Sequence, residues 1–67
     1  MMEISVNGAV HRLEASICVA ELIEKLGMAG RKIAVEKNGE IVPRSAHART
    51  PLADGDRLEL VVAVGGG

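Results

Sequence analysis

Apolar and polar residues alternate along residues 2–6, which is the period of a strand with one buried face. Asn7-Gly8 follows at once, and this dipeptide is typical of two-residue hairpin turns because both central positions of a type I′ turn need a positive φ. Residues 9–14 are therefore predicted to return as a second, antiparallel strand. If Val6 pairs with Ala9, one face of this hairpin carries Ile4, Val6, Ala9, His11 and Leu13.

A helical period follows the hairpin. Apolar residues recur at i, i+3, i+4 and i+7, at Val19, Leu22, Ile23 and Leu26, and they predict a helix with one apolar stripe. Gly27 is a natural C-terminal stop. The start has two candidates. Cys18 stands three residues before Glu21, which is the spacing of a capping box, and Ser16 is an alternative cap that starts the helix earlier.

The second half of the chain reads as short strands separated by turns. Apolar runs at residues 33–35 and 40–42 flank Asn38-Gly39, a second hairpin-type turn, and Pro43 ends the later run because it cannot donate to a ladder. Residues 45–49 are short and polar enough for a single helical turn. After the Asp54-Gly55-Asp56 turn, the last strand is predicted over residues 57–64.

The predicted order is thus two strands, one helix, two strands and a final strand. This order favours an α+β fold with a mixed sheet of about five strands packed on one main helix. The helical crossover makes strand one or two parallel to a later strand. On the last strand, the side chains expected to face the helix are Leu58, Leu60 and Val62.

Composition narrows the classes of protein that fit. The chain has 67 residues, enough for one small domain, and its single cysteine cannot form an internal disulfide, which suits a cytoplasmic setting. No apolar run is long enough to span a bilayer, and no signal peptide is visible. A net charge of -1 and the lack of Phe, Tyr and Trp argue against nucleic-acid binding. We expect neither a membrane nor a nucleic acid among the partners.

Candidate catalytic residues make a weak pattern. Ser45, His47 and Asp54 supply the residue types of a hydrolytic triad, but their spacing does not fix the geometry that a triad needs. Cys18 is either a nucleophile at a helix start or, more in keeping with a lone cysteine, a small buried hydrophobic residue. His11 and His47 with one cysteine do not make a metal-ligand pattern. We predict no catalytic residue and no metal site.

The C-terminal residues are the most informative. Gly65, Gly66 and Gly67 follow the last strand, and glycine has no Cβ, so such a tail can thread a narrow channel. A threaded tail delivers the α-carboxylate of Gly67, which we take as the functional group on which other proteins act; the alternative is a terminus with no role. Beside it, the apolar residues Val61, Ala63 and Val64 form a predicted docking surface, with ordinary exposed apolar area as the alternative.

Several segments, in order, resemble the bacterial sulfur-carrier proteins of thiamin thiazole synthesis. They are Ile4-Ser5-Val6-Asn7-Gly8, Val19-Ala20-Glu21-Leu22-Ile23, Asn38-Gly39-Glu40-Ile41-Val42-Pro43-Arg44, Asp54-Gly55-Asp56-Arg57-Leu58-Glu59-Leu60 and the terminal Gly66-Gly67. The resemblance covers essentially the whole chain. It implies a β-grasp, ubiquitin-like domain over residues 1–64 and a flexible glycine tail over residues 65–67.

The resemblance also implies a function. An adenylating partner uses ATP to activate the Gly67 carboxylate, a sulfur-transfer protein supplies a persulfide, and the resulting thiocarboxylate gives its sulfur to thiazole synthase. The chain itself is then not an enzyme and binds no cofactor. Two departures are visible: Cys18 stands where the family more usually has Thr or Ser, and residues 45–49 lack the aromatic often found after the Pro-Arg pair.

Three alternatives stay open at this stage. The nearest is a sulfur carrier for molybdopterin synthesis, which would share the fold and the tail. The second is a non-covalent ubiquitin-like binding module whose tail is incidental. The third is a protein modifier, in which the Gly67 carboxylate is joined to a lysine.

Overall fold

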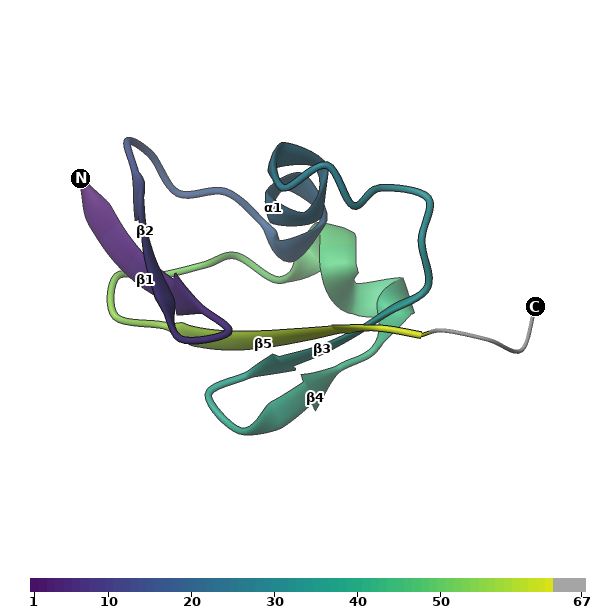
Figure 1. Cartoon of the computed structure of the whole chain (residues 1–67). Helices are drawn as coiled ribbons and strands as arrows, with labels where there is room; N and C mark the ends of the chain where they lie inside the picture. Colours follow the sequence, from purple (N-terminus) through teal and green to yellow (C-terminus); the bar gives the residue numbers. More distant parts are fainter. Residues whose placement is uncertain (64–67) are drawn as a thin grey trace.

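A computed structural model describes residues 1–63 of the chain. Its elements are β1 (Met2–Val6), β2 (Ala9–Leu13), α1 (Val19–Lys25), β3 (Ile33–Lys37), β4 (Glu40–Val42), the 3-10 helix η1 (Arg44–Arg49) and β5 (Arg57–Val62). Figure 1 shows the strands as one twisted sheet, with α1 and η1 on the same side of it. The predicted order of strands and helix is confirmed, and the polar segment before the last strand does form a short helix.

The sheet has five strands in the order β2-β1-β5-β3-β4. β5 lies in the centre, parallel to β1 and antiparallel to β3, and the two outer pairs are antiparallel hairpins. The sheet is therefore mixed, as predicted, and strand one is the strand that runs parallel to a later one. The last strand of the sequence occupies the most protected position in the sheet.

Both Asn-Gly dipeptides form the predicted hairpin turns. Asn7 and Gly8 have φ values of 51° and 86°, and Asn38 and Gly39 have 52° and 86°. Positive φ at both central positions is what a type I′ turn requires, and asparagine tolerates this region better than other non-glycine residues. The first turn sets the register in which Val6 opposes Ala9, as expected.

Helix α1 begins at Val19 with Cys18 as its N-cap. The Cys18 N–H donates to Glu21 Oε1 at 3.0 Å, which satisfies one backbone donor at the helix start and holds the pKa of Glu21 below its ordinary value. The alternative cap was wrong: Ser16 lies outside the helix, and its hydroxyl donates to the carbonyl of Leu52 at 2.9 Å. The hydroxyl thus ties the β2–α1 connection to the segment before β5.

The core fills the space between α1 and one face of the sheet. Its most deeply buried side chains are Leu22 and Val19 of α1, which meet Val35 and Leu58 from the sheet; all four are 1% exposed or less. Burial of one such aliphatic side chain contributes roughly 1.5–3 kcal/mol. The remaining buried apolar side chains are Ile4, Val6, Leu13, Ile23, Val42, Leu52 and Leu60.

Three strand boundaries differ from the prediction. β2 ends at Leu13, one residue before the predicted end at Glu14. β3 continues to Lys37, because its later residues pair with β5 as far as Leu58. β5 ends at Val62, so Ala63 lies beyond the strand, although its N–H still donates to the carbonyl of Lys32 at 2.8 Å. Val64 lies outside the described residues.

Candidate functional site

The strand that leads to the C-terminal glycines, β5, is the central strand of the sheet. β5 has a neighbour on each side, and its last residue, Val62, pairs with Ile33 at the start of β3. In Figure 1 the yellow end of β5 lies on the side of the molecule away from the N-terminus. The predicted carrier residues Gly65, Gly66 and Gly67 fall outside the described residues, so the structure fixes only the strand that leads to them.

One face of the sheet is not covered by α1 or η1. On this face, Val61 of β5 is 61% exposed and lies opposite Ala34 of β3, which is also exposed, and Ala63 is exposed at the end of the row. We name Ala34, Val61 and Ala63 the open-face patch. The predicted exposure of Val61 and Ala63 is confirmed, whereas their role in docking stays a prediction.

Acidic residues border the open-face patch. Glu36 of β3 and Glu59 of β5 face each other across the two strands, two residues along from Ala34 and Val61 and therefore on the same face. Beyond Glu36 on β4 lies Ile41, which is 68% exposed. The open face therefore combines exposed aliphatic groups with carboxylates, and a partner surface that matches it needs apolar area with basic groups around it.

The residue types of a triad are not brought together. The Asp54 carboxylate accepts a hydrogen bond from the Glu3 N–H at 2.6 Å, at the start of the sheet. His47 lies on η1, where its Nε2 is 3.2 Å from the carbonyl of Val42, and Ser45 is exposed on the same short helix. Asp54 therefore shares no hydrogen bond with either residue, so the three do not form a catalytic unit.

Cys18 and His11 are both half-buried and lie on different elements of the fold. Cys18 is half-buried at the start of α1 and forms an isolated bridge with Pro51. His11 is half-buried on β2 opposite Ile4. Within residues 1–63, no group of three or more His, Cys, Asp and Glu side chains is placed to hold a metal ion. Nor does this part of the chain include a helix of the length and hydropathy needed to cross a membrane.

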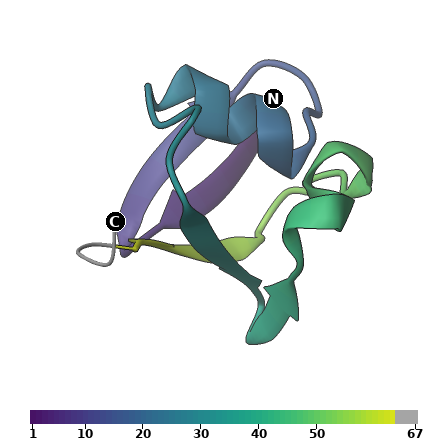
Figure 2. The same ribbon diagram turned by 90° about the vertical axis from the view of Figure 1, so that its right-hand side faces the viewer.

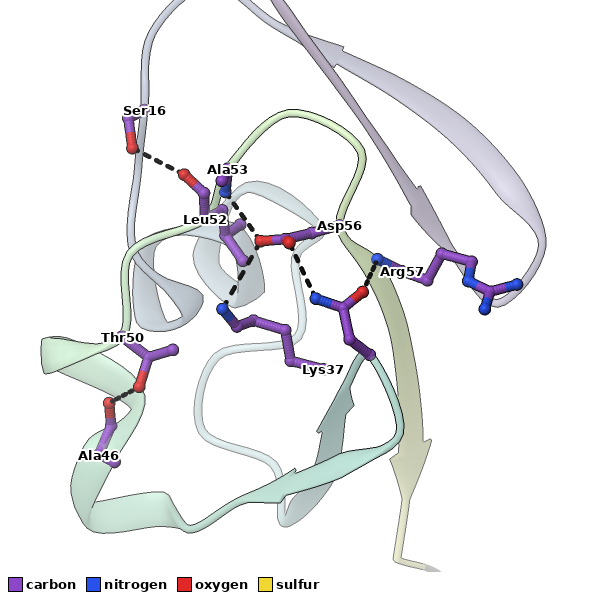
Figure 3. Close-up of polar contacts among 9 residues, drawn as sticks. Ser16, Lys37, Ala46, Thr50, Leu52, Ala53, Asp56 and Arg57 are labelled. Atoms are coloured by element: carbon purple, nitrogen blue, oxygen red, sulfur yellow. Dashed lines mark hydrogen bonds and ion pairs between the residues drawn. The ribbon is translucent and has the colours of Figure 1, made fainter.

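The sequence patterns placed Asp56 in a turn but did not predict its burial; it is the one buried charged residue of the described chain. Its carboxylate accepts hydrogen bonds from the Ala53 N–H at 2.8 Å and from Asn38 Nδ2 at 2.9 Å, and Lys37 Nζ lies 3.7 Å away (Figure 3). Burial raises the pKa of Asp56, but the two hydrogen bonds and the lysine charge outweigh it and hold the pKa below its ordinary value. Asp56 thus fixes the β3–β4 turn against the start of β5.

These features define a class of protein. The sheet and helix form a β-grasp, ubiquitin-like domain. The chain belongs to the ThiS family, whose model matches residues 3–67. The predicted family and fold are therefore confirmed.

A solved structure of high similarity agrees with this assignment. The thiamine biosynthesis protein (ThiS) from Geobacter metallireducens is 36% identical, with a TM-score of 0.83 over 98% of this chain and 100% of the other. Two curated thiazole synthases also match over 98% of this chain, one from Paramagnetospirillum magneticum at 46% identity and one from Magnetococcus marinus at 38%. The chain spans only 20% of the length of either synthase.

Proposed function

We propose that the protein carries sulfur as a thiocarboxylate at Gly67 and supplies it for the thiazole ring of thiamin. The observation that carries the proposal is the family match, which continues through residue 67 and so includes the glycines after β5. The thiamine biosynthesis protein from Geobacter metallireducens, which is matched over its whole length, supports the thiazole pathway over the molybdopterin alternative. The activated group, the partners and the use of ATP are part of this proposal.

The proposed chemistry starts from a poor electrophile. A carboxylate resists nucleophilic attack because its negative charge is shared by two oxygens. An adenylating partner therefore joins the Gly67 carboxylate to the AMP moiety of ATP and releases pyrophosphate. A persulfide on a sulfur-transfer protein then attacks the acyl carbon and displaces AMP. A second thiol then attacks the sulfur of the transfer protein in the resulting S–S bond. It forms a disulfide with that sulfur and releases the thiocarboxylate, whose sulfur passes to the thiazole precursor.

In this scheme the chain contributes position and recognition, and the partners contribute catalysis. Glycine at positions 65, 66 and 67 keeps the end of the chain slim enough for a partner's active site. The glycines follow β5, which is hydrogen-bonded to β1 on one side and to β3 on the other. The folded domain therefore holds the start of the glycine segment in a fixed position. The chain binds no cofactor in this scheme, and ATP belongs to the adenylating partner.

The partners are proposed from two kinds of support. The two thiazole synthases each contain a segment similar to nearly the whole of this chain, which supports the proposal that the carrier and thiazole synthase act together. The open-face patch, together with Val64, is the surface we propose for recognition by the adenylating enzyme, because its apolar area lies directly beside the end of β5. The cytoplasmic setting stays a prediction.

Adenylation can be tested apart from sulfur transfer. The protein ending at Gly67 is mixed with the adenylating enzyme and ATP, and pyrophosphate release is measured against a variant that lacks Gly67. We expect release with the first protein and background release with the second, while both unfold at similar temperatures. Equal release from both would show that the Gly67 carboxylate is not the activated group. A carrier already known to be adenylated by the same enzyme serves as the positive control.

A further inference from the structure

A groove separates α1 from η1 on the side of the sheet opposite the open face. It has a volume of about 290 Å³ and is open to solvent. Figure 2 shows η1 (green) beside one end of α1, while the connection from the other end of α1 runs down to β3 on the opposite side of the picture. Its lining comes from α1, from residues 29–31 of that connection, from Ile33 and from η1.

The groove is apolar inside and mainly basic at its rim. Ile23 and Ile33 lie in it with largely covered side chains, whereas Arg31 and Arg44 are exposed and Glu24 is the single carboxylate of the lining. Within residues 1–63, neither Arg31 nor Arg44 forms an ion pair. The charge of the rim is therefore complementary to an acidic group.

The wall formed by η1 is held in place by hydrogen bonds. Thr50 Oγ1 donates to the carbonyl of Ala46 at 2.7 Å, and the carbonyl of Thr50 accepts from the Val19 N–H at 2.9 Å. His47 Nε2 donates to the carbonyl of Val42 at 3.2 Å, since a carbonyl can only accept. These bonds connect η1 to α1 and β4, so the groove is formed before any partner arrives.

The groove lies next to the end of β5, the strand that leads to the C-terminal glycines. Ile33, which lines it, pairs with Val62 at the end of β5, and the Ala63 N–H donates to the carbonyl of Lys32. A partner that holds the residues after β5 therefore has its own surface next to this groove. The open-face patch, which we propose the same partner contacts, lies on the opposite face of the sheet beside the end of β5.

We propose that the groove between α1 and η1 is a second docking site for the adenylating enzyme, and that it takes a segment of that enzyme carrying an apolar side chain next to a carboxylate. The inference rests on the proposed function. The volume of about 290 Å³ is just below the roughly 300–1,000 Å³ typical of ligand pockets, which suits one anchoring side chain. The carboxylate of the segment is held by Arg31 and Arg44.

Two variants disturb the groove in different ways. Arg44→Glu reverses the charge of the rim, and Ala48→Phe places a large side chain in the space, since Ala48 is an exposed lining residue. Arg12→Glu makes the same charge change on β2, where Arg12 forms an exposed ion pair with Glu3 and does not line the groove. Each protein lacks Gly67, so that binding is measured without turnover, and circular dichroism melts check that each one folds.

The readout is the Kd for the adenylating enzyme, measured by calorimetry. We expect each groove variant to raise the Kd by about tenfold or more, and Arg12→Glu to leave it near that of the parent. Groove variants that bind like the parent would overturn the second docking site, even if the chain that retains Gly67 is adenylated normally. A chain that retains Gly67 and is neither bound nor adenylated would overturn the proposed function itself.

The alternative occupant of the groove is a second copy of this chain, and a measurement of self-association tests for it. Sedimentation of the protein alone, without enzyme, is expected to give a monomer with or without Arg44→Glu. A dimer that Arg44→Glu dissociates would mean that a second copy of this chain fills the groove, and it would overturn the assignment to the enzyme.

Discussion

The side chain of Asn7 pairs with the backbone of Leu60. Asn7 Nδ2 donates to the Leu60 carbonyl at 3.0 Å, and the Leu60 N–H donates to Asn7 Oδ1 at 2.8 Å. The Asn7 N–H also donates to the carbonyl of Leu58 at 2.9 Å. The side-chain amide thus takes the place of a strand residue and continues the parallel β1–β5 ladder past Val6, at the middle of the strand that leads to the C-terminus.

Asn7→Asp tests this pairing. The substitution keeps the acceptor for the Leu60 N–H but replaces the donor by a second oxygen, which then faces the Leu60 carbonyl. We expect the free energy of unfolding to fall by about 1–2 kcal/mol, because a half-buried carbonyl loses its partner. Urea denaturation measures the change, with Glu40→Gln on the exposed side of β4 as the control. If the Asn7→Asp protein is as stable as the parent, the assigned role is contradicted.

Protonation of Asp56 is expected to destabilise the protein in acid. Its folded-state pKa is held below the ordinary value of 3.8, so the carboxylate stabilises the fold above the unfolded-state pKa, and this stabilisation is lost as the pH falls through the lower folded-state pKa. Urea titrations from neutral pH to below 3.8 are expected to show this loss. Asp56→Asn removes the titrating group, so the variant is less stable at neutral pH and its stability falls less in acid. An unchanged acid dependence would contradict the role of Asp56.

Truncation of the helix side of the core is expected to be costly. Leu22 is 1% exposed between α1 and the sheet, so Leu22→Ala should lower the free energy of unfolding by about 2–5 kcal/mol. Val61→Ala on the open face should change it by no more than about 0.5 kcal/mol. Chemical denaturation of both variants checks the contrast. Equal losses would mean that the interface between α1 and the sheet is not buried, or that the open face is not exposed, as described above.

The open-face patch is expected to act in recognition rather than in stability. Val61→Lys places a charge in the centre of the patch, and we expect the KM of the adenylating enzyme for this variant to rise by about tenfold, with a stability loss within about 1 kcal/mol. The matched control is Val10→Lys, because Val10 is 66% exposed on the outer strand β2. A rise in KM that is the same for both variants would point to overall charge instead of the patch.

Local patterns predicted most of the fold. The two Asn-Gly turns fix both hairpins and their registers, because few other dipeptides accept positive φ at two successive positions. The apolar stripe from Val19 predicted α1 and the face that it buries. The β-grasp class came from the resemblance, which the family match confirms.

Contacts between distant residues were the part that the sequence did not reveal. The Asn7–Leu60 pairing joins residues that are 53 positions apart. Ser16 was a candidate helix cap on local spacing alone, since its hydrogen bond to Leu52, 36 positions away, cannot be read from the neighbouring sequence. The groove between α1 and η1 has the same origin, since its lining comes from three separate elements. Periodicity reports which face of an element is buried, but it does not report which two elements will meet.

Intact mass spectrometry tests the central claim most directly. The protein ending at Gly67 is incubated with the adenylating enzyme, ATP and a persulfide donor, and its mass is measured before and after. We predict an increase equal to the replacement of one oxygen by one sulfur, localised to Gly67 by fragmentation. An unchanged mass under conditions in which a known carrier is converted would contradict the assignment of Gly67 as the sulfur-carrying residue.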